Sequence, residues 1–322
     1  MTGSLDVAIT NLTSVAVLVF VFGFLAARIK SDVRIPEPIY QIISIYLLFG
    51  IGLKGGNGLH SATVEEFIAP ALGTIAIGIL IPVVAFFSLK FIRSLSAMDR
   101  GSIAAHYGST SLVTFSATLL FLENNLIEVE GFATALLTLL EIPGLIVGIY
   151  LGTRSSKGSV KWRETMLEVL LGKTVLLLTG GLVIGALTTE SGYDKVAPFF
   201  VDLQNGILAL FLLHLGFLAG TNWHEIKRVG FPLIVFALIF PVFAGFVGVS
   251  VGTATGLSVG GATVLGVLAA SASYIAAPAA ISVAMPQANG SLALMSSIGI
   301  TFPFNLVLGI PIYLEMARAF AG

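Results

Sequence analysis

Two stretches of small and hydroxyl-bearing residues interrupt otherwise apolar segments of this chain. One runs from His106 to Ser111 and the other from Ala269 to Pro278. Proline lacks a backbone N–H and disfavours helix at the residue before it, so the second segment is predicted to break. A helix that restarts after such a break presents unpaired N–H groups and the positive end of its dipole, while Ser and Thr add donors. That chemistry suits a small anion.

The same residue types have a structural interpretation. Membrane helices use Ser, Gly and Ala for close packing and for hydrogen bonds to the preceding turn. Either stretch alone is explained about equally well by both interpretations. Because two such stretches occur at corresponding places in the chain, we favour a solute site, as expected of a transporter.

Glu141 is the strongest single candidate for a functional side chain. It lies about ten residues from each end of the apolar segment 131–151, and is therefore expected near the bilayer centre. A carboxylate there is costly unless it has a partner, and Na⁺ is one such partner because it prefers hard oxygen ligands. The alternative is a protonated Glu141 that hydrogen-bonds between helices.

Four further residues join Glu141 as candidates for cation binding or coupling, although the sequence leaves open whether Na⁺ binds there. They are Ser111, Tyr274, Thr301 and Asn305. Asn and Thr also serve as hydrogen-bonding contacts between membrane helices, and for Thr301 and Asn305 the two interpretations stay open.

The composition is that of a polytopic membrane protein. Of 322 residues, 56% are hydrophobic and 10% charged, and the mean hydropathy is +1.00. The absence of cysteine excludes thiolate metal sites and thiol nucleophiles, and no other nucleophile and base pair is visible, so we predict no enzymatic activity. We expect no cofactor, and the net charge of −1 gives no reason to expect nucleic acid binding.

Ten apolar segments are each long enough to cross the roughly 30 Å hydrocarbon core. They fall at about 8–27, 36–53, 67–89, 101–121, 131–151, 166–187, 198–219, 231–251, 260–283 and 291–316. When alternate loops are assigned to opposite sides of the membrane, one side carries twelve Lys and Arg residues and the other side three. Because cytoplasmic loops are enriched in these residues, we predict both termini outside and the Arg154–Arg163 loop inside.

The two halves of the chain carry matching residues. Gly52 and Gly56 correspond to Gly216 and Gly220, and Glu141-Ile142-Pro143 to Thr301-Phe302-Pro303, at offsets of 160 to 164 positions. We therefore predict an all-α fold with a first five-helix repeat at 1–152, a cytoplasmic linker at 153–165 and a second repeat at 166–322. An odd number of spans per repeat inverts the second copy, so the broken fourth and ninth helices meet across a pseudo-two-fold axis.

Several motifs in this order resemble the sodium-dependent bicarbonate transporters of the SbtA type. They include Ile35-Pro36-Glu37, Gly52-Leu53-Lys54-Gly55-Gly56, Gly108-Ser109-Thr110, Glu141-Ile142-Pro143 and Ala269-Ala270-Ser271-Ala272-Ser273. The resemblance implies a ten-span carrier with core and gate domains, an elevator-type movement of the core and a homotrimer. It also implies a location in the bacterial inner membrane.

The same resemblance implies that the anion lies between the two broken helices. The residues that match the family's pattern there, with the tyrosine before them, are Tyr107, Gly108, Ser109, Thr110, Ser271, Ala272 and Ser273. Two tyrosines depart from that pattern. Tyr274 stands where the cyanobacterial proteins have an acidic residue, and Tyr107 stands where a serine is usual. The loop 152–161 is shorter than the family's linker to a PII-like regulator.

These observations together predict a secondary transporter that imports a small anion, most simply bicarbonate with Na⁺. One alternative is proton-coupled transport of another small anion or monocarboxylate, which Tyr274 in place of an acid favours. A non-transporting membrane receptor or scaffold is the alternative of another class. It would bind a ligand without flux.

Overall fold

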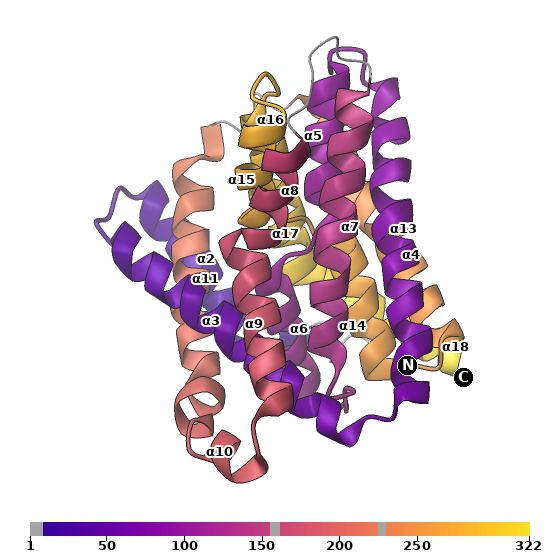
Figure 1. Ribbon diagram of the computed structural model, residues 1–322. Coiled ribbons are helices and arrows are strands. Elements are labelled where there is room, and N and C mark those ends of the chain that lie inside the picture. The colour runs from indigo at the N-terminus through magenta and orange to yellow at the C-terminus, as the bar shows by residue number, and fades with distance from the viewer. Residues whose placement is uncertain (1–8, 155–161, 225–229) are drawn as a thin grey trace.

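The computed structural model describes residues 9–154, 162–224 and 230–322, and every regular element in them is helical (Figure 1). The helices are α2 (Val15–Arg28), α3 (Glu37–Gly58), α4 (Val64–Ser88), α5 (Ala97–Gly108), α6 (Leu112–Asn124), α7 (Ala133–Thr153), α8 (Trp162–Leu171), α9 (Lys173–Leu187), α10 (Glu190–Asp194), α11 (Gln204–Thr221), α13 (Phe231–Ala254), α14 (Val259–Ala270), α15 (Ala276–Ala284), α16 (Gly290–Leu294), α17 (Phe302–Phe304) and α18 (Ile310–Ala321). The predicted all-α fold is confirmed.

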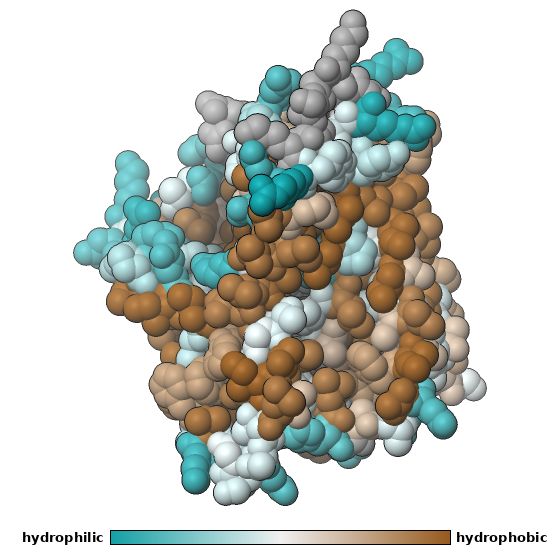
Figure 2. All heavy atoms as spheres, viewed as in Figure 1, coloured by the Kyte–Doolittle hydropathy of each residue, from teal (hydrophilic) through white to brown (hydrophobic). Residues whose placement is uncertain are grey.

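Six helical spans in the described residues are long and apolar enough to cross a membrane. They are Glu37–Gly58, Val64–Phe91, Ala133–Thr153, Pro198–Thr221, Phe231–Ala254 and Gly290–Ala321. A seventh results if α8 and α9, which meet at a 49° bend, count as one. The other three predicted spans coincide with the shorter helix α2 and with the helix pairs α5/α6 and α14/α15. Figure 2 shows a broad hydrophobic band between two hydrophilic ends.

Part of the predicted topology falls outside the described residues. Residues 155–161 make up most of the predicted linker at 153–165, and Lys227 and Arg228 belong to a predicted inside loop. Helix α8 already begins at Trp162. The count of ten spans and the orientation of the termini stay predictions.

The helices pack as two groups. In the first, α2 lies along α11 and α3 along α9, and we call these the four-helix group. The second, the central group, contains α4 to α7, α13 to α15 and the span Gly290–Ala321, with α4, α5 and α7 packed together and α13 against α14. Figure 1 shows the four-helix group on the left and α4 and α13 on the right.

Glycines allow the helix backbones to touch in both groups. In the four-helix group, a Cβ on Gly56 would overlap the backbone of α9, and one on Gly216 would overlap the backbone of α2. In the central group, a Cβ on Gly144 of α7 would overlap the backbone oxygen of Gly108, where α5 ends. Small residues commonly permit this approach between membrane helices.

We expect Gly144→Ala to destabilise the protein, because α7 must move away from the end of α5. Overpacking of this kind costs about 1–3 kcal/mol, so the melting temperature of the detergent-purified protein falls. Gly180→Ala is the matched control, since nothing lies within 4 Å of a Cβ built there. Equal melting temperatures for the two variants would show that the contact between α5 and α7 is not tight.

The last span is helical throughout but changes its winding. It contains two π-helical stretches, Met295–Thr301 and Asn305–Gly309, on either side of α17. Pro303 is the second residue of α17 and Pro311 the second residue of α18, so each lies two positions after one of these stretches. Proline cannot donate the hydrogen bond of a regular helical turn. Such local π-helical winding is frequent at functional sites. Here it carries the candidate residues Thr301 and Asn305.

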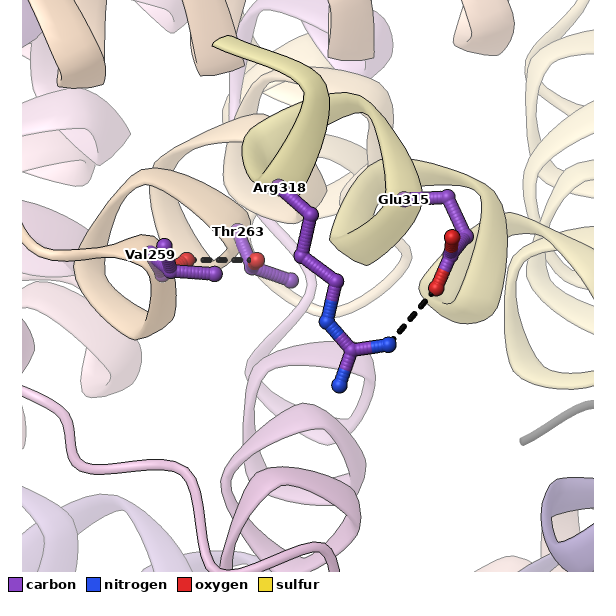
Figure 3. Close-up of polar contacts among 4 residues, drawn as sticks. All are labelled: Val259, Thr263, Glu315 and Arg318. Atoms are coloured by element: carbon purple, nitrogen blue, oxygen red, sulfur yellow. Dashed lines mark hydrogen bonds and ion pairs between the residues drawn. The ribbon is translucent and has the colours of Figure 1, made fainter. Parts of the chain in front are cut away.

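Polar side chains near the end of this span make their polar contacts within their own helices. Figure 3 shows α14, where the Thr263 hydroxyl donates to the Val259 oxygen at 2.7 Å, next to α18. There Arg318 and Glu315 form an ion pair one turn apart, at 2.7 Å. Both side chains of that pair are about 40% exposed, so the pair adds little stability. The packing of α14 against α18 is therefore mainly apolar.

Candidate functional site

Both predicted breaks are present. Helix α5 ends at Gly108 and α6 begins at Leu112, with Ser111 as its N-cap. Helix α14 ends at Ala270 and α15 begins at Ala276, and the residues between them are not helical. Each broken segment thus places a helix N-terminus in the interior of the protein, at α6 and at α15.

The two breaks lie against each other. The Ser273 N–H donates to the His106 oxygen at 2.8 Å, and the Ser111 N–H donates to Ser271 Oγ at 2.9 Å. The Ser111 hydroxyl also donates to the Tyr274 hydroxyl at 3.3 Å. Segments some 160 residues apart in the chain therefore share one polar site, as the sequence predicts.

The expectation that the backbone N–H groups of the breaks are unpaired is wrong for three of them. Those of Ser111 and Ser273 are bonded across the site, and that of Thr110 donates to Glu141 Oε2 at 3.2 Å. The reason is that buried backbone donors find protein partners when no ligand takes the bond. Any anion that binds here must replace some of these contacts.

Glu141 of α7 lies beside the first break and is fully buried. Its Oε2 accepts a second hydrogen bond, from Thr110 Oγ1 at 2.5 Å. Its other oxygen, Oε1, is buried and has no partner among the described residues. The Ser109 hydroxyl lies close to the carboxylate but forms no well-aligned hydrogen bond. The carboxylate is thus held by one oxygen and has a free acceptor on the other.

A cavity of about 10 Å³ lies between the breaks. This is about the room that one water molecule requires, and bicarbonate is larger. Its polar lining consists of Thr110, Ser111, Glu141, Thr174, Ser273 and Tyr274, and its apolar lining of Leu112, Leu137, Leu178 and Ile275. All these polar groups bind through oxygen, the ligand atom that hard cations prefer. The described residues contain no group of three His, Cys, Asp or Glu side chains that would hold a metal ion.

Thr301 and Asn305 connect the breaks to other helices. The Thr301 hydroxyl lies 2.6 Å from the Tyr107 hydroxyl and donates to the Ala237 oxygen at 2.7 Å. The Asn305 amide donates to the oxygen of Ala270, the last residue of α14, at 2.8 Å, and accepts from the Tyr313 hydroxyl at 2.9 Å. Neither side chain lines the cavity, so in this arrangement both position the broken helices.

A family model supplies an independent observation. The model of the Na⁺-dependent bicarbonate transporter superfamily matches residues 15–318. The chain belongs to this superfamily. The match covers both breaks and all the candidate residues, so the resemblance predicted from the motifs is confirmed. No curated protein matches the chain at a significant level.

Membership of this superfamily supports a transporter role. It therefore implies a membrane transporter and not an enzyme. Of the twelve predicted site residues, five line the cavity: Thr110, Ser111, Glu141, Ser273 and Tyr274. Ser109 and Ser271 contact this group without lining it. Gly108 packs against Pro82 and Gly144, and Ala272 is a buried apolar residue of the second break.

Thr174 is the polar cavity residue that our sequence prediction omits. It is the second residue of α9, two positions after Gly172, and Gly172 separates α9 from α8. A glycine followed by polar residues inside an apolar span is a recognisable sign of an interrupted helix. The contact of α9 with the breaks depends on tertiary packing, which the sequence does not display.

Proposed function

We propose that the protein imports bicarbonate together with Na⁺. The observation that carries the proposal is the meeting of the α5/α6 and α14/α15 breaks next to the buried carboxylate of Glu141. Two helix N-termini favour a negative charge between them, and a carboxylate oxygen without a partner favours a cation at its side. The superfamily's name includes both species.

Bicarbonate would bind between the breaks by replacing contacts that the protein makes with itself. The bonds from Ser111 N to Ser271 Oγ and from Ser273 N to the His106 oxygen join one break to the other. A small separation of the breaks would release both N–H groups to an anion. The donors would then face the ligand without any new side chain being recruited.

The transport movement would be a displacement of the central group against the four-helix group, as in an elevator.

Two sets of contacts support an inverted repeat. Helix α3 packs on α9 through Gly52 and Gly56, and α11 packs on α2 through Gly216 and Gly220, the glycines at corresponding positions in the two halves. Likewise α4 contacts α5 in the first half, and α13 contacts α14 in the second. The four-helix group would be the gate domain.

We further propose a homotrimer in the bacterial inner membrane with both termini outside. The superfamily membership and the segregation of Lys and Arg support this assignment. Regulation by a PII-like protein would involve the 152–161 segment, most of which lies outside the described residues.

Uptake of labelled bicarbonate into proteoliposomes, with and without an inward Na⁺ gradient, tests the proposed function. We expect the gradient to drive uptake, and Ser109→Ala combined with Ser273→Ala to reduce it roughly tenfold or more. The estimate follows from about 1.5–3 kcal/mol for a hydrogen bond to a charged group. Ser282→Ala is the control because Ser282 is exposed and bonds only within α15. Unchanged uptake in the double variant would remove the assigned anion site.

Proton-coupled transport of another small anion is the second candidate. It is favoured by the free Oε1 of Glu141 together with the Tyr274 hydroxyl, in place of an acid, in the same cavity. A carboxylate in such a position can carry a proton instead of binding a cation. Uptake that follows a pH jump in the complete absence of Na⁺ would replace the sodium proposal.

A further inference from the structure

Helix α9 begins at the boundary between the two helix groups. Gly172 separates it from α8, and the two helices differ in direction by 49°. No side chain caps the N-terminus of α9. Its axis belongs to the four-helix group, because α9 packs along α3, whereas its first turn reaches the cavity between the breaks. The start of α9 is therefore where the four-helix group contacts the polar site.

Thr174 is the polar side chain that α9 contributes to this cavity. It is 7% exposed, and its hydroxyl has no hydrogen-bond partner among the described residues. Threonine hydroxyls inside helices usually donate to the oxygen four residues earlier, as Thr153 does to Ile149 in α7. Near a helix N-terminus after a break, that bond is not formed. The Thr174 hydroxyl thus lines the cavity and can bind whatever occupies it.

The lining of the cavity defines the chemistry of that occupant. Glu141 Oε1 has no partner, and the cavity also contains the hydroxyls of Ser273 and Tyr274. One carboxylate among neutral hydroxyls balances a single positive charge. A volume of about 10 Å³ admits an ion or a water molecule and excludes a polyatomic anion. Hard oxygen ligands and one negative charge match a dehydrated alkali cation better than a divalent ion.

We propose that Thr174 is a ligand of the coupling Na⁺, contributed from the four-helix group, while Glu141 is its charged ligand from the central group. The ion is then held across the boundary between the two groups. This inference rests on the proposed function, and it adds a cation ligand on the side of the protein that does not carry the breaks.

The position of this ligand has a consequence for coupling. When the central group slides, Glu141 and the breaks move with it and Thr174 stays with α9. The cation loses one ligand, so its affinity differs between the two positions of the central group. A ligand shifts a conformational equilibrium only through such a difference in affinity. Na⁺ therefore favours the arrangement in which the site faces α9.

The test is Thr174→Val, which keeps the shape of the side chain and removes the oxygen, compared with Thr174→Ser, which keeps the oxygen. We expect the Na⁺ concentration for half-maximal uptake to rise at least tenfold in Thr174→Val. In Thr174→Ser it should stay within about threefold of the wild type. The apparent bicarbonate affinity at saturating Na⁺ should change little in either variant. Thr188→Val at the other end of α9 is the control, because Thr188 does not line the cavity and donates to the Ile184 oxygen.

A binding measurement separates this inference from the proposed function. Na⁺, but not K⁺, should raise the melting temperature of the purified wild-type protein, since a ligand that binds the folded form stabilises it. Thr174→Val should lose this shift, and Thr174→Ser should retain it. Wild-type protein that is stabilised by Na⁺ but takes up no bicarbonate would overturn the proposed substrate alone. A Thr174→Val protein with wild-type Na⁺ dependence in both measurements would overturn the inference.

Discussion

Glu141→Gln is expected to abolish Na⁺-driven uptake. The amide oxygen of glutamine can still accept the hydrogen bonds from Thr110, so the first break keeps its local contacts. The position of Oε1, however, is then taken by an NH₂ group, which carries no negative charge and presents hydrogens to a cation. Loss of a buried charged ligand costs about 3 kcal/mol or more, which corresponds to roughly a hundredfold loss of Na⁺-dependent transport. Uptake as a function of Na⁺ concentration measures this effect.

Two other substitutions show that the charge is responsible. Glu141→Asp keeps the carboxylate but shortens it by one methylene, so we expect weakened Na⁺ dependence with residual transport. Glu123→Gln removes a carboxylate from an exposed position near the end of α6 and should leave transport unchanged. If Glu141→Gln transports with normal Na⁺ dependence, the residue serves as a hydrogen-bonding contact between α7 and the first break and binds no cation.

Local sequence features predict much of this fold because single residues decide where its helices end. Ser96, Ser111 and Ser258 are side-chain caps, and each directly precedes the first residue of a helix. The hydroxyl and glycine residues of both breaks occur where the helices are interrupted. Hydropathy alone would predict one continuous helix for α5 and α6 and another for α14 and α15. The polar residues within these segments indicate that both helices are interrupted.

The relative position of the broken helices is predictable only through the matching residues of the two halves of the chain. Correspondence between Gly108-Ser109-Thr110 and Ser271-Ala272-Ser273 indicates that the breaks are equivalent, and the structure places them in contact. The matching residues used above do not include Thr174, which reaches the site because α9 packs on α3 and is bent away from α8. Similarly, the π-helical winding around Pro303 depends on how the last span fits between neighbouring helices.

The pairing of internal backbone donors is the feature that sequence reasoning predicts least well. A break in a helix exposes N–H groups in principle, but each finds a partner if a suitable acceptor lies nearby. In this protein the acceptors are Glu141, Ser271 and the His106 oxygen, all within hydrogen-bonding distance of a break. Occupied donors and a small cavity describe a closed arrangement of the proposed anion site, which would have to open for transport.

A covalent link between the two helix groups is expected to stop transport, because the proposed mechanism requires them to slide. Phe20 of α2 and Phe302 of α17 lie on opposite sides of the boundary, with ring centroids 5.4 Å apart. The chain contains no cysteine, so a Phe20→Cys and Phe302→Cys pair would be the only thiols in the protein. A short bifunctional methanethiosulfonate reagent would join them. We expect bicarbonate uptake to fall at least tenfold on linking and to recover on reduction.

The matched control links two residues within the four-helix group. Phe24 of α2 and Trp223, two residues after the end of α11, have ring centroids 5.6 Å apart, almost the same separation. Because α2 and α11 belong to one group, a link between Phe24→Cys and Trp223→Cys should leave uptake unchanged. Each single-cysteine variant must transport before linking, since loss of a buried phenyl ring alone costs about 3–5 kcal/mol of stability. If complete linking of the first pair leaves uptake intact, the two groups do not slide. Bicarbonate would then have to cross by local opening of the breaks.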